Sequence, residues 1–311
     1  MILITENPKV NKMHQTIEAS RKTNRSCDVL ALSSRENPAI LTIAHRGFWT
    51  LTAENSLASV RAAVSAGVEM IEIDTQATVD GRLVVIHDET LDRTTTGQGT
   101  VSDLPFETVR AAKLKAGAGG NAAAITTETV PTLEELLEEA RGRITVNIDT
   151  KFTRDLPQVM ETVLRLGVED QVLVKTDIDP EAIRFEILEK DWFGKIPHMP
   201  MFPVRKGRFA EDLRRIEALR APMIEVKFTD IADLLEGRAE LERQNIRLWI
   251  NTLDVSHCQD FNDTRALSNP DAVWGALAAA GVGAIQTDEV EAFRNWLKTG
   301  AGESGDRGHD E

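Results

Sequence analysis

Strand-like and helical segments alternate through most of this sequence, and that alternation limits the possible fold more than any other feature. Helical patterns lie between many of the strands, with Asp179-Pro180 and Asn269-Pro270 marking two helix starts. Parallel strands require crossover helices of this kind, and a long series of strand–helix units closes into a barrel. The strand candidates are residues 39–44, 69–79, 82–87, 144–151, 171–175, 198–202, 222–227, 247–251 and 283–286.

We therefore expect a distorted (β/α)8 barrel of the TIM type over residues 39–299, although 311 residues would also allow two domains. Nine candidates for eight barrel strands leave one in excess, either in the hairpin at 69–87 or in the weak segment at 198–202. Residues 1–38 are polar and irregular, and we expect an N-terminal extension whose arm or short helix packs outside the core. Residues 300–311 are expected to form a polar C-terminal tail.

The hairpin is predicted to bring three polar side chains together. Asp80-Gly81 is a strong signal for a two-residue hairpin turn, and counting outward from it places Asp74 opposite His87. Glu72 lies two positions before Asp74 and leaves the strand on the same face. Two carboxylates and an imidazole should therefore converge, provided that the hairpin has no bulge.

Polar side chains also stand where other strands end, which is where the active site of such a barrel lies. Three carboxylates there form an oxygen-rich pocket that suits a hard cation, Mg²⁺ or Ca²⁺. Two cationic side chains beside it suit an anion, and phosphate fits best, while two histidines suit proton transfer near neutral pH. The candidates are His45, Arg46, Glu72, Asp74, His87, Asp149 and Lys151, with Trp249 and Asn251 as further substrate contacts at the end of a later strand.

Composition excludes several classes of function. The net charge of −14 and the absence of Lys/Arg runs argue against nucleic acid and against a polybasic membrane contact. Cys27 and Cys258 are isolated, which gives no disulfide framework and suits a reducing, cytoplasmic location. We also expect no signal peptide, no stable membrane insertion, and a flexible loop at 116–129 whose glycines lack the Lys-Ser/Thr pair of a phosphate-binding loop.

The residues that carry these candidates match a known pattern of His-Arg-Gly, Glu-x-Asp and a later His-Asp. The chain resembles the glycerophosphodiester phosphodiesterase family, whose distorted barrel is related to phosphatidylinositol-specific phospholipase C. The resemblance covers roughly residues 40–290. It rests on AHRG (44–47), AENS (53–56), EIDTQATVDGRLVVIHDETLDRTT (72–95), VPTLEELLE (130–138), IDTK (148–151) and QTDE (286–289).

The resemblance implies a metal-dependent phosphodiesterase that hydrolyses a small glycerophosphodiester-like substrate to an alcohol and a phosphomonoester. One Mg²⁺ or Ca²⁺ would be the cofactor. The implied roles are an acid/base pair of His45 and His87, metal ligands Glu72, Asp74 and Asp149, phosphate contacts Arg46 and Lys151, and Glu54 and Asn55 in support near the first histidine.

Three departures from the family pattern leave the substrate open. Ala53 replaces the usual Pro, Asp149 replaces the usual Glu, and Ile250-Asn251 replaces Thr-Val after the tryptophan. An enzyme of the same fold acting on a sugar-linked phosphodiester, such as an opine or phosphoglycan fragment, or on a lysophospholipid, is therefore an alternative.

Two readings from other classes fit less well. An amidohydrolase barrel needs His-x-His on the first strand, where only His45 stands. A non-catalytic phosphate-binding protein would not need a pair of proton-transferring histidines.

Overall fold

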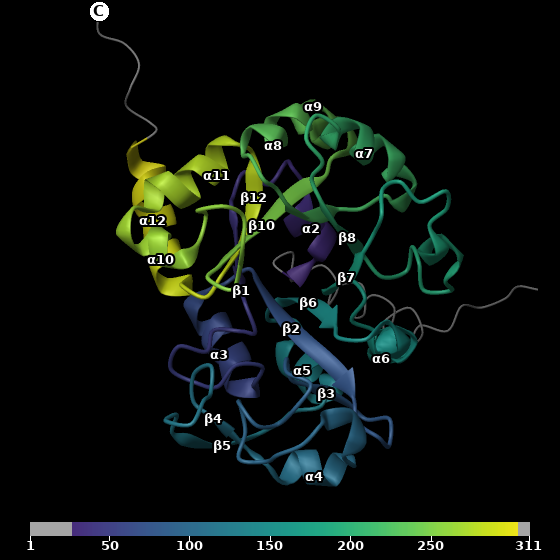
Figure 1. Ribbon diagram of the computed structural model, residues 1–311, viewed down its shortest axis with the longest axis vertical. Helices are drawn as coiled ribbons and strands as arrows, with labels where there is room; N and C mark the ends of the chain where they lie inside the picture. Colours follow the sequence, from purple (N-terminus) through teal and green to yellow (C-terminus); the bar gives the residue numbers. More distant parts are fainter. Residues whose placement is uncertain (1–26, 304–311) are drawn as a thin grey trace, which may run out of the picture.

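The computed structural model describes residues 27–303, and side chains as far as residue 300. Its main sheet contains eight parallel strands, and β1 pairs with both β12 and β2, which closes the barrel. The predicted TIM-type barrel is therefore confirmed (Figure 1). In their spatial order the barrel strands are β1 (Leu41–Ala44), β12 (Val282–Thr287), β10 (Arg247–Leu253), β9 (Met223–Lys227), β8 (His198–Pro203), β7 (Val172–Asp177), β6 (Thr145–Thr150) and β2 (Met70–Ala77).

The excess strand belongs to the hairpin. Its second arm, β3 (Leu83–Val85), pairs antiparallel with β2 and does not enter the barrel, whereas the weak segment at 198–202 supplies β8. A short strand β11 (Ser256–His257) folds back on β10. The loop expected at 116–129 is partly wrong, because residues 125–129 form β5 (Ile125–Thr129), which pairs with β4 (Lys113–Lys115) in a separate two-stranded sheet.

The hairpin turn is one residue longer than predicted. Thr75 pairs with Val85 rather than with Ile86, and the Thr78 N–H donates to the Arg82 carbonyl (3.0 Å), which leaves a three-residue loop. The Thr78 hydroxyl accepts from the Arg82 N–H (3.0 Å), and Gly81 adopts a left-handed φ of 76° that this longer turn requires. The register therefore moves by one position, and Asp74 does not face His87.

Most of the helices cover the outside of the barrel (Figure 1). Their ends follow local sequence signals: Ser56 and Thr132 form capping boxes, and Gly67 and Gly167 close two helices in the left-handed conformation. The described helices are α2 (Val29–Ser33), α3 (Leu57–Ala66), α4 (Phe106–Ala111), α5 (Leu133–Ala140), α6 (Leu156–Leu166), α7 (Phe209–Arg215), α8 (Ala232–Glu236), α9 (Arg238–Gln244), α10 (Asp263–Ser268), α11 (Ala276–Ala279) and α12 (Val290–Glu303). Of these, α2 lies inside the ring of strands and α4 lies beside the hairpin (Figure 1).

One barrel unit lacks its expected helix. Between β7 and β8 the described chain forms only a 3₁₀ turn, Glu186–Glu189, although Asp179-Pro180 predicts a helix start. The Asp179 carboxylate instead accepts from the Glu181 N–H (2.9 Å) and holds a local turn. The connection from residue 178 to residue 197 is thus irregular and lies over the side of the barrel mouth.

The described part of the N-terminal extension packs into the barrel rather than outside it. Val29 of α2 is fully buried in a cluster with interior side chains of the barrel strands, among them Leu41 and Trp249. The Arg247 guanidinium holds this segment by donating to carbonyls of residues 33–39, and burial lowers its pKa to about 10.

The expected terminal segments lie largely outside the described residues, namely 1–26 and 304–311. At the other end of the described chain, α12 continues past the expected boundary at 299. None of the helices within residues 27–303 combines the length and apolar character needed to cross a membrane.

Candidate active site

A cavity of about 630 Å³ opens at the C-terminal ends of the barrel strands. Most of the predicted site residues line it, although they come from five separate strands or loops. Those brought together are His45, Arg46, Glu72, Asp74, His87, Asp149 and Asn251. Lys151 and Trp249 do not line this cavity, and Glu54 and Asn55 lie behind its wall, where they contact Arg46 and Asp74.

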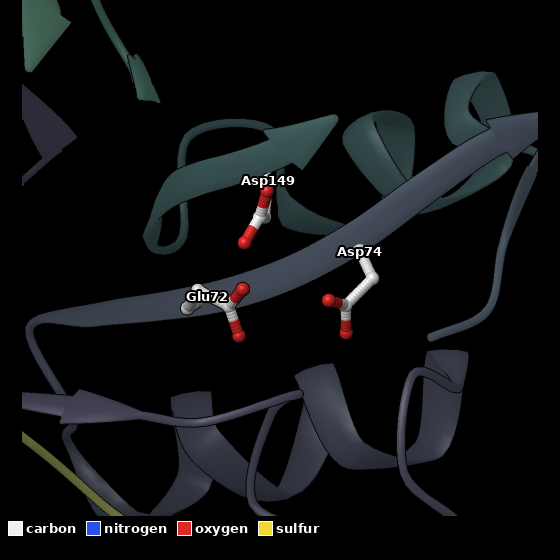
Figure 2. Close-up of side chains that lie close together, drawn as sticks. All are labelled: Glu72, Asp74 and Asp149. Atoms are coloured by element: carbon white, nitrogen blue, oxygen red, sulfur yellow. The ribbon is translucent and has the colours of Figure 1, made fainter. Parts of the chain in front are cut away.

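Three carboxylates meet at one side of the cavity (Figure 2). Glu72 and Asp74 lie on β2, and Asp149 pairs directly with Asp74 on the neighbouring strand β6. One oxygen from each lies within 4.8 Å of the others. Burial and the neighbouring Asp74 raise the pKa of Glu72 well above its usual value, because like charges destabilise one another.

This donor set fits a hard divalent cation. Its members offer only carboxylate oxygens, which are the ligands preferred by Mg²⁺ and Ca²⁺. A cation at this position would also compensate the mutual repulsion that raises the pKa of Glu72. The geometry thus agrees with the predicted ligands Glu72, Asp74 and Asp149 without distinguishing between the two metals.

A buried lysine that sequence reasoning missed stands beside these carboxylates. The Lys175 ammonium lies 3.0 Å from Asp149, 3.5 Å from Glu225 and 3.7 Å from Glu72. Burial alone would lower its pKa, but these carboxylates raise it well above its usual value. The sequence signal for Lys175 was its position as a single cationic residue directly after the apolar stretch of residues 172–174.

Lys151 does not occupy the place that was predicted for it. Its side chain is exposed after the end of β6, and it lines a neighbouring cavity rather than the one with the histidines. Lys175, on the next strand, supplies the buried positive charge instead. β6 ends at Thr150, and Lys151 lies in the bend that follows it.

Arg46 is held in a constrained position at the rim of the carboxylate cluster. Its backbone is left-handed, with φ of 56°, and its N–H donates to Glu72 (3.3 Å). Its guanidinium donates to Glu54 (3.0 Å) and lies 3.4 Å from Asp74. Asn55 donates to Asp74 (2.8 Å) and receives the Asp74 N–H (3.2 Å). In the structure, Glu54 and Asn55 therefore contact Arg46 and Asp74.

Each histidine of the cavity pairs with a carboxylate through Nδ1. His45 Nδ1 lies 2.8 Å from Asp288, and His87 Nδ1 lies 2.8 Å from Asp88. Hydrogen bonds from Arg93, together with the bond to His87, hold the pKa of Asp88 well below its usual range. An ionised carboxylate requires a proton on the facing Nδ1, which leaves Nε2 as the nitrogen for exchange with a substrate.

Arg93 connects the second histidine to the carboxylate cluster. It donates from Nε to Asp88 (2.7 Å) and from both terminal nitrogens to Glu54 (2.8 and 2.9 Å), which also binds Arg46. A continuous set of charged hydrogen bonds thus runs from His87 to Arg46. Arg93 and Asp88 lie within the sequence segment 72–95, but only the geometry shows their role.

The prediction of Trp249 as a substrate contact is wrong, because its side chain is fully buried in the barrel interior. Its indole N–H donates to Asn251 (2.7 Å), and Asn251 donates to Glu225 (2.8 Å), which faces Lys175. The tryptophan therefore positions a polar chain below the cavity. Asn251 does line the cavity as predicted.

Sequence comparisons give the family. The model of the glycerophosphoryl diester phosphodiesterase family matches residues 45–191, and a domain of unknown function matches residues 198–297. A glycerophosphodiester phosphodiesterase from Caldanaerobacter subterraneus is 45% identical over 264 residues, covering 84% of this chain and 98% of the relative. An uncharacterized Bacillus subtilis protein is 37% identical over 139 residues, which cover 43% of this chain and 56% of that relative.

Solved structures agree on the fold. A glycerophosphoryl diester phosphodiesterase from Parabacteroides distasonis, 23% identical, superposes with a TM-score of 0.71 over 87% of this chain and 90% of its own. A phosphodiesterase from Oleispira antarctica, solved in complex with the product sn-glycerol-3-phosphate, is 21% identical. It superposes with a TM-score of 0.58 over 85% of this chain and 98% of its own. The family predicted from sequence, with its class of phosphoric diester hydrolases, is thereby confirmed: the chain belongs to the glycerophosphodiester phosphodiesterase family.

Proposed function

We propose that this protein hydrolyses small glycerophosphodiesters to an alcohol and a phosphomonoester, with one divalent cation as cofactor. The observation that carries the proposal is the pair of carboxylate-bound imidazoles, His45 and His87, which open on the same cavity as three clustered carboxylates. The names of the relatives support the substrate class. We also propose a cytoplasmic location. It is supported by the two isolated cysteines, which are both buried and form no disulfide.

Glu72, Asp74 and Asp149 would hold the cation. When bound, the cation supplies positive charge that polarises the phosphate and lowers the pKa of a nearby hydroxyl. Arg46 and Lys175 supply fixed charge for the phosphate from two sides of the cluster. Lys151 would contact the substrate only from the rim, since it lines the adjoining cavity.

The two histidines would transfer the protons of the reaction. One imidazole removes the proton from the substrate hydroxyl next to the ester, and that oxygen attacks phosphorus to form a cyclic phosphate. The other imidazole gives a proton to the leaving alcohol oxygen, and water then opens the ring. Asp288 and Asp88 fix the tautomers, and each acid/base contribution is worth roughly 10²- to 10⁴-fold.

Phosphorus NMR of glycerophosphocholine with the purified protein tests this function. With Mg²⁺ or Ca²⁺ present we expect glycerol phosphate to form and a transient cyclic phosphate to be visible, and EDTA should stop the reaction. Binding of phosphodiester without turnover in either metal would instead identify a phosphate-binding protein. The exposed His257 lies outside the cavity, so His257→Ala is a matched control for both histidine variants.

A further inference from the structure

A buried carboxylate, that of Asp263, lies behind the ends of two barrel strands. Asp263 is the first residue of α10, is 3% exposed, and does not line the active-site cavity. One of its oxygens accepts from the hydroxyls of Thr252 (2.6 Å) and Thr287 (2.7 Å). These threonines are neighbours on β10 and β12, because Asn251 pairs with Gln286. The carboxylate therefore fastens the ends of both strands to α10.

The other oxygen of Asp263 leads to the active site. It accepts from the backbone N–H of Asp288 (2.9 Å), the residue that directly follows β12. The Asp288 carboxylate in turn lies 2.8 Å from Nδ1 of His45, and the His45 N–H donates to the Thr287 carbonyl (3.4 Å). Both the ring and the backbone of His45 are thus bound to the segment that Asp263 holds.

A carboxylate is an expensive side chain at this buried position. Its three donors are all uncharged, namely the two threonine hydroxyls and the N–H of Asp288. Burial, with a smaller contribution from the like charge of Asp288, raises the pKa of Asp263 to about 7, although these hydrogen bonds oppose the shift. Buried groups with such shifted pKa values are typical of functional sites, so a role beyond packing is worth testing.

The start of α10 does not need Asp263, because other side chains secure it. Asn262 caps the helix by accepting from the Arg265 N–H (2.9 Å). Asp254 accepts from both the N–H (2.9 Å) and the hydroxyl (2.6 Å) of Thr264. The Asp263 carboxylate is therefore directed at the strand ends and at Asp288 rather than at its own helix.

We propose that Asp263 is a positioning residue for phosphodiester hydrolysis, and that it acts through Asp288 to fix the tautomer and direction of the His45 imidazole. The inference rests on the proposed function, in which this imidazole transfers a proton. While Asp288 keeps its place, Nδ1 of His45 carries a proton and Nε2 stays available to the substrate. Without Asp263 the Asp288 N–H loses its acceptor, and the Asp288 carboxylate is free to turn away from the ring.

The second histidine does not depend on this network. Its partner Asp88 is held by Arg93, whose Nε and one terminal nitrogen donate to the two carboxylate oxygens (2.7 and 2.8 Å). A change at Asp263 should therefore affect His45 and leave His87 as it is. His87 thus serves as an internal control in every sample.

Nitrogen NMR of the protein with isotope-labelled histidine tests the link without any turnover. With Mg²⁺ present and no substrate, Asp263→Ala should move the His45 signals toward the Nε2–H tautomer, while the His87 signals stay as in wild type. Spectra of His45→Ala and His87→Ala assign the signals. Asp263→Asn keeps the size and an oxygen that can accept from the Asp288 N–H, so its His45 signals should resemble those of wild type.

The kinetic test measures hydrolysis of glycerophosphocholine with the divalent cation present. Asp263→Ala should lower kcat by roughly 10- to 10²-fold with little change in KM, because a displaced imidazole transfers protons poorly. In a His45→Ala background the same substitution should change kcat little, because the imidazole that it positions is already absent. A loss of packing alone would lower kcat by the same factor in both backgrounds.

Two threonine variants provide a milder pair that keeps the carboxylate, should Asp263→Ala fail to fold. Thr252→Val removes a hydroxyl that lies 2.6 Å from Asp263, so it should lower kcat several-fold and shift the His45 signals in the same direction. Thr264→Val is the matched control, because it removes a hydroxyl 2.6 Å from Asp254 at the start of the same helix. It should leave both measurements unchanged, and thermal melts verify the folding of all variants.

The outcomes separate this inference from the proposed function. Unchanged His45 signals in Asp263→Ala, or equal losses of kcat in both backgrounds, would overturn the positioning role and leave the proposed function standing. The opposite result is a protein that hydrolyses no glycerophosphocholine, but whose His45 signals change in Asp263→Ala and not in Thr264→Val. That result would support the link from Asp263 to His45 and refute the proposed function.

Discussion

The two sides of the barrel mouth present different kinds of side chain. On the side of β1, β2, β6 and β7 the cavity is lined by carboxylates, cationic side chains and histidines, from His45 to Lys175. On the side of β8, β9 and β10 the same cavity has a mainly apolar wall, into which Glu225, Lys227, Asn251 and Ser256 are interspersed. Its apolar side chains are Met201, Phe202, Pro203, Val226, Leu253 and Val255.

The family comparisons divide at the same place. The charged wall falls within residues 45–191, which match the glycerophosphoryl diester phosphodiesterase family, whereas the apolar wall falls within residues 198–297, which match a domain of unknown function. We infer that the charged wall determines the reaction and that the apolar wall helps to select the alcohol. Variants on each side can therefore test whether the two walls have these different roles.

The largest effect is expected from the histidines of the charged wall. His45→Ala or His87→Ala should lower kcat by roughly 10²- to 10⁴-fold with little change in substrate affinity, because each removes a proton-transfer group. The double variant should be scarcely slower than the poorer single variant, since the pair acts as a unit. Steady-state kinetics with a nitrophenyl phosphodiester add a second criterion. Because nitrophenolate needs little protonation to leave, this substrate should restore the turnover only of the variant that lacks the general acid.

Replacing each of the two lysines by methionine tests which lysine side chain belongs to the charged wall. Lys175→Met leaves Asp149, Glu225 and Glu72 without their shared ammonium, and breaking a buried ion pair costs about 3–5 kcal/mol. Lys151→Met changes an exposed side chain and should stay within about 0.5 kcal/mol. Urea unfolding measures both, and added Ca²⁺ or Mg²⁺ should restore part of the loss in Lys175→Met. Equal stability of the two variants would contradict this assignment.

The free energy of unfolding should fall in acid through His198, the first residue of β8. Burial lowers the pKa of His198 to about 4, and its Nε2 lies 2.9 Å from the Thr176 hydroxyl. A lowered folded-state pKa stabilises the protein above the unfolded value near 6.5, and the contribution is lost as the pH falls toward 4. The loss over that interval is about 3 kcal/mol.

His198→Gln isolates this contribution. The difference in unfolding free energy between wild type and variant, measured by urea titration at several pH values, should shrink as the pH falls from 7 to 4. His257→Gln changes an exposed histidine of β11 and provides the control. A pH-independent difference for His198→Gln would show that the buried imidazole does not titrate in this interval.

The two sides also differ in how well sequence predicts them. His45, Asp74 and Asp149 were found because polar residues at the ends of buried strands are conspicuous and the barrel brings those ends together. His87 was placed in the cavity for a partly wrong reason, since the three-residue turn shifts the hairpin register. Hydrogen bonds of the Thr78 hydroxyl with Asp80 and Arg82 accompany that longer turn, and strand patterns do not reveal them.

Contacts between distant segments account for the remaining differences. The strand pattern does not show that β6 ends early enough to expose Lys151, or that Trp249 points to the closed end of the barrel rather than to its mouth. The cavity that Lys151 lines borders the connection between β7 and β8, which forms no α-helix in the described chain although the local sequence favours one. Tertiary packing overrides local propensity in such segments.

The smallest effect is expected where the two cavities meet, at Asp149. Asp149→Glu restores the residue usual in the family and keeps an oxygen ligand, so calorimetry should show metal affinity within about tenfold of wild type, and kcat a few-fold changed. The Asp149 side chain is 36% exposed, which leaves room for one more methylene, whereas Asp149→Asn keeps the size and should weaken the metal by removing charge.

Asp149 lines both adjoining cavities, so the variants at this position test whether it acts as a metal ligand or only as part of the wall. A metal affinity of Asp149→Asn equal to that of wild type would contradict the assignment of Asp149 as a ligand. A collapsed melting transition would identify Asp149 as a packing residue and remove it from the metal site.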